Sequence, residues 1–139
     1  MELQVGVKVL LKNREGKWLL LRRSVEKYPE VGAKWDIVGG RIDPGTPLLE
    51  NLKREVKEET SLDLKEETVR LVGAQDILRI EGKHVVRLTY VGEAEGELML
   101  SDEHDKFEWF TLEEMKKMGQ AELDTYFKEL LMKGVFDSD

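Results

Sequence analysis

Three glutamates in one short segment are the residues of this sequence whose type and spacing best suit chemistry. Glu55, Glu58 and Glu59 lie within Leu52-Lys53-Arg54-Glu55-Val56-Lys57-Glu58-Glu59-Thr60. On a helix, offsets of three and four residues place side chains on one face, where like charges destabilise the helix. A bound divalent cation is the simplest compensation. Oxygen ligands favour Mg²⁺ or Mn²⁺, and such an ion can neutralise and orient a phosphate group.

Simpler interpretations of this segment remain open. Acidic helix faces are common and often serve only solubility. The neighbouring basic residues Lys53, Arg54 and Lys57 could also offset the three carboxylates. The loop from Gly39 to Gly45 favours the metal interpretation, because glycine lets backbone carbonyls approach a metal or a phosphate without a Cβ in the way.

A helix from Thr46 to about Thr60 would position the carboxylates. Thr46 can act as its N-cap, and Pro47 suits the first helical position. Leu48, Leu52 and Val56 follow at helical spacing, so the glutamates should border an apolar stripe rather than face away from it.

The rest of the chain predicts strands and two further short helices. Alternating or apolar runs indicate strands at 3–11, 17–22, 69–80, 84–91 and 107–110, with a turn at 93–96 and a loop at 24–34. Thr111 and Glu114 form a capping box that opens a helix to Met118. A last helix, with Leu123, Phe127 and Leu130 on one face, should end before Gly134. This mixture predicts an α/β (α+β) fold with a mixed sheet covered by helices, organised as one domain over residues 1–139.

Composition excludes several classes of protein. Acidic residues outnumber basic ones 29 to 22, for a formal charge of −7, which argues against binding duplex nucleic acid through its phosphates. The absence of cysteine excludes disulfides, zinc–thiolate sites and thiol nucleophiles. The longest apolar run, Trp18-Leu19-Leu20-Leu21, is too short to span a membrane. With no signal peptide visible at the N-terminus, we expect a cytoplasmic protein.

The glycine loop and the acidic helix together resemble the Nudix hydrolase family. The family box G-x5-E-x7-R-E-U-x-E-E-x-G-U, where U is a bulky aliphatic residue, would run from Gly40 to Leu62. Seven of its nine fixed positions match at the correct spacing: Gly40, Arg54, Glu55, Val56, Glu58, Glu59 and Leu62. Thr46 replaces the family's Glu, and Ser61 replaces a Gly that normally ends the helix in a left-handed conformation.

The resemblance implies an α/β/α sandwich with a mixed central sheet, and cleavage of a diphosphate linkage with Mg²⁺ or Mn²⁺ as cofactor. By this analogy Glu55, Glu58 and Glu59 bind metal, the Gly39 carbonyl adds a ligand, and Arg54 orients a glutamate. Glu103 resembles an additional acidic residue of many members. Either Glu55 or Glu103 would be the general base. The expected partner is a small nucleotide, and a homodimer is left open.

Four residues are candidates for substrate binding: Arg22, Arg23, Arg41 and Trp35. The arginines could contact phosphates, and the tryptophan could stack on a base, although large aromatic residues more often belong to the core. By exclusion among the substrates of the family that it resembles, the expected substrate is a nucleoside triphosphate or a small nucleotide adduct such as a nucleotide sugar. The changes at Thr46 and Ser61 motivate one alternative, a catalytically attenuated module that binds a nucleotide without cleaving it.

Overall fold

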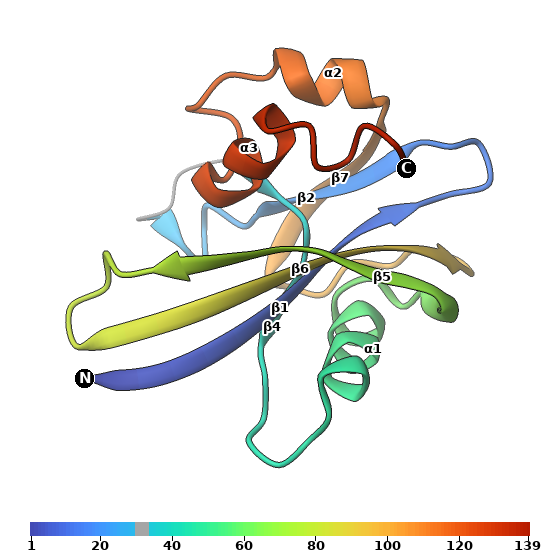
Figure 1. Cartoon of the computed structure of the whole chain (residues 1–139). Coiled ribbons are helices and arrows are strands. Elements are labelled where there is room, and N and C mark those ends of the chain that lie inside the picture. Colours follow the sequence, from blue (N-terminus) through green and yellow to red (C-terminus); the bar gives the residue numbers. More distant parts are fainter. Residues whose placement is uncertain (30–33) are drawn as a thin grey trace.

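The computed structural model describes residues 1–29 and 34–139, and its centre is a mixed β-sheet with helices on both faces (Figure 1). The predicted α+β class is confirmed. The loop predicted at 24–34 falls partly on residues 30–33, outside the described residues. The elements, in chain order, are β1 (Glu2–Lys12), β2 (Trp18–Arg23), β3 (Trp35–Asp36), β4 (Val38–Arg41), α1 (Leu48–Thr60), β5 (Asp63–Ile77), β6 (Lys83–Glu95), β7 (His104–Phe110), α2 (Leu112–Lys117) and α3 (Thr125–Met132). No helix among the described residues is long and apolar enough to cross a membrane.

Strand β1 organises the sheet. It runs parallel to β6, in register from Glu2 opposite Lys83 to Lys12 opposite Glu93, and its middle pairs antiparallel with β4. β5 and β6 form an antiparallel hairpin, and β2 pairs with β3 and β7. Because parallel strands need a crossover connection, the chain between β1 and β6 has room to place α1 against one face of the sheet.

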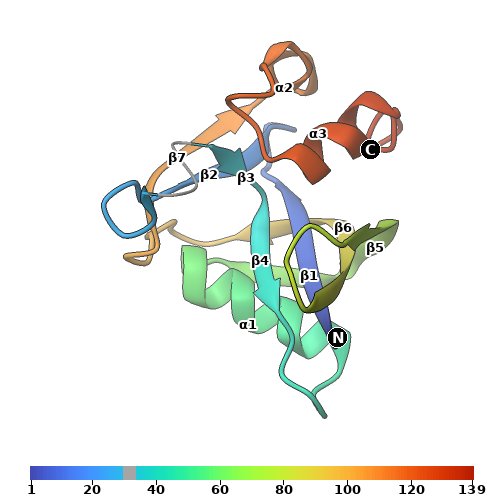
Figure 2. The same ribbon diagram turned by 90° about the vertical axis from the view of Figure 1, so that its left-hand side faces the viewer.

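Two apolar cores lie on opposite faces of the sheet. Val7, Val9 and Leu11 of β1 pack with Leu52 and Val56 of α1 in one core. Leu10 belongs instead to the second core, where α3 and the C-terminal segment contribute Phe127, Leu130, Leu131 and Phe136. Figure 2 shows α1 on one side of the strands and α2 and α3 on the other. Leu10 breaks the alternation of β1 because both faces of the sheet are covered at this end.

The boundaries of α1 differ partly from the prediction. The helix begins at Leu48 with Pro47 as its N-cap, and no side chain caps it, so the expectation that Thr46 is the N-cap was wrong. Asn51 orders this loop instead: its amide group donates to the Thr46 and Pro47 carbonyls at 2.8 and 2.9 Å and accepts from the Asp43 N–H at 2.9 Å.

Two other turns differ in how far the local sequence determines the backbone conformation. Ser61 ends α1 at φ 64°, the left-handed conformation that the family pattern assigns to glycine. The turn predicted at 93–96 was wrong, because β6 continues to Glu95 in register with the start of β5, and only Gly96 has a positive φ, 116°. The pairing partner, 32 residues away at Asp63, decided this segment.

Candidate active site

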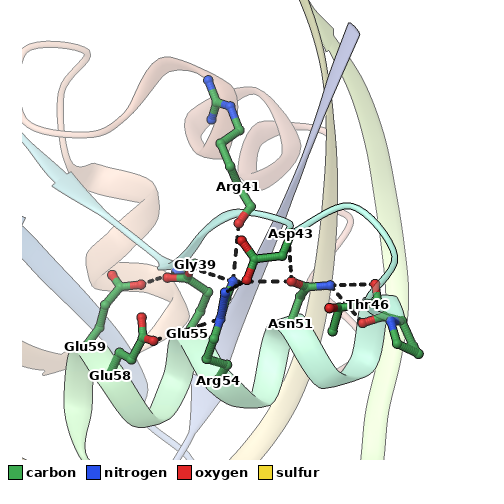
Figure 3. A network of polar contacts seen from close by, with 10 residues as sticks. Gly39, Arg41, Asp43, Thr46, Asn51, Arg54, Glu55, Glu58 and Glu59 are labelled. Atoms are coloured by element: carbon green, nitrogen blue, oxygen red, sulfur yellow. Dashed lines mark hydrogen bonds and ion pairs between the residues drawn. The ribbon is translucent and has the colours of Figure 1, made fainter.

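Helix α1 carries its carboxylates at the edge of its buried face. Leu52 and Val56 are fully buried, which fixes the orientation of the helix. Glu55 and Glu59 leave the helix beside this stripe and lie close to β4 (Figure 3). Their side chains are 15% and 5% exposed, whereas that of Glu58 is 62% exposed. The three predicted neighbours are therefore placed as a buried pair and one solvent-facing carboxylate.

Two glycines allow β4 to approach the buried pair. The Gly39 N–H donates to Oε2 of Glu59 at 3.0 Å. Gly39 has φ 144°, and a Cβ there would lie 2.0 Å from the Val7 carbonyl oxygen; a Cβ on Gly40 would lie 2.9 Å from both carboxylate oxygens of Glu55. Only glycine fits this close approach. The contact places the Gly39 N–H, rather than its carbonyl oxygen, against the carboxylate.

The buried pair holds two like charges close together. Burial, foremost, and the adjacent Glu55 carboxylate raise the pKa of Glu59 well above its usual value, while Lys8 and the Gly39 N–H act in the opposite direction. A divalent cation between the two carboxylates would remove this repulsion, and the all-oxygen donor set suits Mg²⁺ or Mn²⁺. Among the described residues no three His, Cys, Asp or Glu side chains lie close enough to hold a metal together, so Glu58 would have to turn inward to join the pair.

Arg54 is held by partners on both sides. Its guanidinium group pairs with Asp43 and donates from Nη2 to Oε1 of Glu55 at 3.1 Å; its Nε lies 4.0 Å from Oε1 of Glu58 (Figure 3). The contact with Glu55 is a single charge-assisted hydrogen bond. Glu55 is thus the glutamate nearest to the guanidinium group, and Asp43 anchors the arginine from the loop.

Glu103 and its neighbour His104 are placed differently from each other. Glu103 is exposed, and its backbone carbonyl accepts from the Ser24 N–H at 3.0 Å. His104 is the residue that reaches the buried pair, with Nε2 3.7 Å from Oε1 of Glu59. Burial, foremost, with Lys8 lowers the pKa of His104 to about 4, so the imidazole is neutral at pH 7.

A charged cleft lies across β4 from α1. Lys8 Nζ and Arg87 Nη2 each contact Asp36, at 3.2 Å, and Arg87 Nη1 contacts Asp124 at 3.1 Å. This network forms the floor of a cavity of about 280 Å³ that is also lined by Gly39 and Gly40. The two glycines therefore contact the carboxylates on one side and the cleft on the other.

The predicted substrate-binding residues divide into two groups. Arg23 and Arg41 line the cleft. Arg22 is engaged elsewhere, with Nε and Nη2 donating to the carboxylate of Asp105 at 2.9 and 3.0 Å. Trp35 packs edge-on against Phe110, with ring centroids 5.6 Å apart, at the margin of the second core. Arg22 and Trp35 are not among the residues that line the cleft.

Sequence reasoning missed five residues of the site: Lys8, Asp36, Asp43, His104 and Asp124. Lys8 left a weak signal, since it is a long cation inside an otherwise apolar stretch of strand. Asp43 left another, because it stands in the glycine loop just ahead of the helix that carries Arg54. The remaining three are brought together only by the fold.

Comparison with known proteins agrees with this geometry. A model of the NUDIX domain matches residues 2–130. The MutT protein from Methanosarcina mazei Go1 superposes with a TM-score of 0.81 at 28% identity, over 99% of this chain and 96% of that one. The MutT NUDIX hydrolase from Burkholderia pseudomallei gives 0.75 at 25% identity, over 95% and 98%. The E. coli ORF135 protein shares the fold, at 0.77 and 22% identity, over 95% and 88%. No curated protein matches significantly.

The family match extends across both the glycine loop and the helix that carries the buried pair. It also covers β1, β4 and β6, the strands that build the cleft. The chain therefore belongs to the NUDIX family, whose members generally hydrolyse compounds that contain a nucleoside diphosphate.

Proposed function

We propose that this protein hydrolyses the diphosphate linkage of a nucleoside diphosphate joined to another group, with Mg²⁺ or Mn²⁺ as cofactor. The observation that carries the proposal is the buried Glu55–Glu59 pair, held against two glycines beside a cationic cleft. A divalent cation would stabilise two carboxylates that repel each other in a nearly buried site, in addition to Arg54 at Glu55 and the Gly39 N–H at Glu59. The substrate is a small nucleotide, such as a nucleoside triphosphate or a nucleotide sugar, and not duplex nucleic acid.

Each residue of the site has at least one task in this proposal. Glu55 and Glu59, joined by Glu58, would hold the metal, which supplies charge neutralisation at the phosphates and an activated water. Arg54 fixes the Glu55 carboxylate through the 3.1 Å hydrogen bond and is itself fixed by Asp43. Gly40 leaves the space in which the Glu55 carboxylate sits.

The general base is assigned to Glu55 rather than Glu103 on the basis of position. The Glu55 side chain is only 15% exposed and lies beside Glu59. Its oxygens face the β4 glycines that border the cleft. Glu103 has an exposed side chain with no ion-pair partner among the described residues. Substitution of Glu55 by Gln should therefore cost more turnover than the same change at Glu103.

A panel of nucleotide substrates, assayed with and without Mg²⁺ for the nucleoside monophosphate and the phosphorylated second product, tests the activity directly. We expect Glu59→Gln and Glu58→Gln each to lower kcat by about 100-fold or more, as loss of a metal ligand or base does. Glu50→Gln is the matched control, because Glu50 lies on the same helix in an exposed pair with Lys53. Near-normal turnover in both test variants would contradict the assignment.

A second candidate function is binding of a nucleotide without cleavage. The observation that favours it is the outward placement of Glu58, together with Ser61 in place of the family's glycine. It predicts nucleotide binding by calorimetry and no Mg²⁺-dependent cleavage of any member of the panel. A cytoplasmic location, a single domain over 1–139 and a homodimer remain predictions from the sequence.

A further inference from the structure

Four arginines from four different parts of the chain meet in the cleft. We call them the arginine face: Arg23 at the end of β2, Arg41 at the end of β4, Arg79 after β5 and Arg87 in β6. Sheet register explains how they meet, because Arg41 and Arg87 both lie opposite Gly6 of β1, one on each side. Nη1 of Arg41 lies beside Gly6, 3.7 Å from where a Cβ would be, which is ordinary van der Waals contact.

Three members of the arginine face have no counter-charge in the described part of the chain. Arg87 is neutralised by its two aspartates, but no described carboxylate lies within 4.0 Å of Arg23, Arg41 or Arg79. Arg23 and Arg79 stack on Tyr28 and Tyr126, and Nε of Arg41 donates to the Gln4 amide oxygen at 3.0 Å. Burial, foremost, and the charges of Arg23 and Arg87 lower the pKa of Arg41, so these guanidinium groups repel one another.

The diphosphate that is hydrolysed would not neutralise the positive charge of the arginine face. Any ion held by Glu55 and Glu59 would meet the scissile diphosphate at the carboxylates, where Arg54 is already paired with Asp43 and Glu55. The cleft across β4 therefore keeps an excess of positive charge, although the chain as a whole has a net charge of −7. Its lining includes five basic side chains, Lys8, Arg23, Arg41, Arg79 and Arg87, against two acidic ones, Asp36 and Asp124.

The chemistry of the cleft suits a phosphate better than a neutral base. Guanidinium groups match phosphate oxygens with paired N–H donors, and three unneutralised groups can surround one phosphate. The only aromatic ring in the described lining belongs to Tyr126, and it is covered by Arg79 and Arg87, whose guanidinium carbons lie 5.2 and 6.0 Å from its centroid. Little aromatic surface is left for a base to stack on.

We infer that the substrate carries at least one phosphate group beyond the diphosphate that is hydrolysed, and that the arginine face binds this additional phosphate. The inference rests on the proposed function, because it takes the scissile diphosphate to lie at the α1 carboxylates. Arg23, Arg41 and Arg79 are the residues that would distinguish a substrate with the additional phosphate from one without it.

Binding by calorimetry in the presence of a chelator tests the inference apart from catalysis. Three matched pairs differ by one phosphate: ATP and ADP, NADP⁺ and NAD⁺, and coenzyme A and dephospho-coenzyme A. For at least one pair we expect the more phosphorylated member to bind about tenfold tighter, as one charge-assisted contact provides. The double variant Arg41→Gln, Arg79→Gln should bring this ratio close to one. Neither arginine has an ion-pair partner among the described residues, so the variant breaks no described salt bridge.

Arg14→Gln is the matched control, since Arg14 is an exposed arginine in the turn between β1 and β2, and it should keep the wild-type ratio. Equal affinity within all three pairs, or a ratio that survives in the double variant, would overturn the inference. Hydrolysis with Mg²⁺ is measured separately. Cleavage without discrimination refutes only the arginine face, and discrimination without cleavage of any compound refutes only the proposed hydrolase.

Discussion

Asp36 lies in the floor of the cleft between two cations, and its charge should stabilise the fold. Its carboxylate oxygens are 3.2 Å from Lys8 Nζ and 3.2 Å from Arg87 Nη2. Burial alone would raise its pKa, but Lys8 and Arg87 together outweigh burial and lower the pKa to about 2. We expect Asp36→Asn, which keeps the shape of the side chain and removes its charge, to destabilise the protein at neutral pH.

The size of the effect follows from the pKa. A fall from 3.8 to about 2 corresponds to about 2.5 kcal/mol, and because the side chain is 28% exposed we discount this to about 2 kcal/mol for solvent screening. For a chain of this length that is a fall in Tm of about 7 °C. Since the folded pKa is lower than the unfolded one, the contribution is complete above about pH 4 and is lost as the pH falls through about 2.

Thermal unfolding of the wild type and of Asp36→Asn, followed from pH 7 down to pH 2.5, measures both predictions. The difference in Tm should be largest at pH 7 and should shrink steadily below pH 4. Asp102→Asn is the control, because Asp102 pairs with Lys27 but its side chain is 85% exposed, and such pairs contribute less than about 1 kcal/mol. The reasoning fails if Asp36→Asn unfolds within 2 °C of the wild type at pH 7, or if its deficit is the same at pH 7 and pH 2.5.

Three further predictions concern α1 and its loop. Mg²⁺ at ten times its Kd should stabilise the wild type by about 1.4 kcal/mol, and Glu59→Gln should lose this rise in Tm; an equal rise in NaCl of the same ionic strength would refute a specific site. Gly40→Ala should fold normally but lose turnover, because its Cβ would lie 2.9 Å from the Glu55 carboxylate oxygens and would push that carboxylate away. A wild-type kcat would contradict this. Ser61→Gly should raise stability by about 0.5 to 1 kcal/mol in urea unfolding, since Ser61 has φ 64°; a loss of stability would show that the left-handed residue is not strained.

The acidic helix was predictable because its signals are local. The stripe of Leu52 and Val56 fixed the buried face, and the spacing of the glutamates fixed their place beside it. The side-chain rotamers were not predictable from spacing. Glu59 is drawn inward by the Gly39 N–H, a partner from another element, whereas Glu58 lies 4.0 Å from Arg54 of its own helix and stays exposed. A helix pattern specifies a face, and contacts from elsewhere in the fold select which members of that face converge.

The cleft was not predictable because a strand pattern does not say which of its faces is covered. Lys8 in Val7-Lys8-Val9 reads as an outward-facing cation on a half-buried strand. In the structure the same face is covered by α3 two residues later, at Leu10, which is fully buried in the second core. Along this face of β1, Lys8 lines the cleft together with Tyr126 of α3, whereas Leu10 packs in the second core with Phe127 and Leu130 of the same helix. Leu10 interrupts the alternation of apolar and polar residues along the strand. This interruption is the sign in the sequence that a second layer covers the sheet. The same argument applies to Arg87, which lies opposite Gly6 on the adjacent parallel strand and is buried only because Asp36 and Asp124 approach from two other parts of the chain.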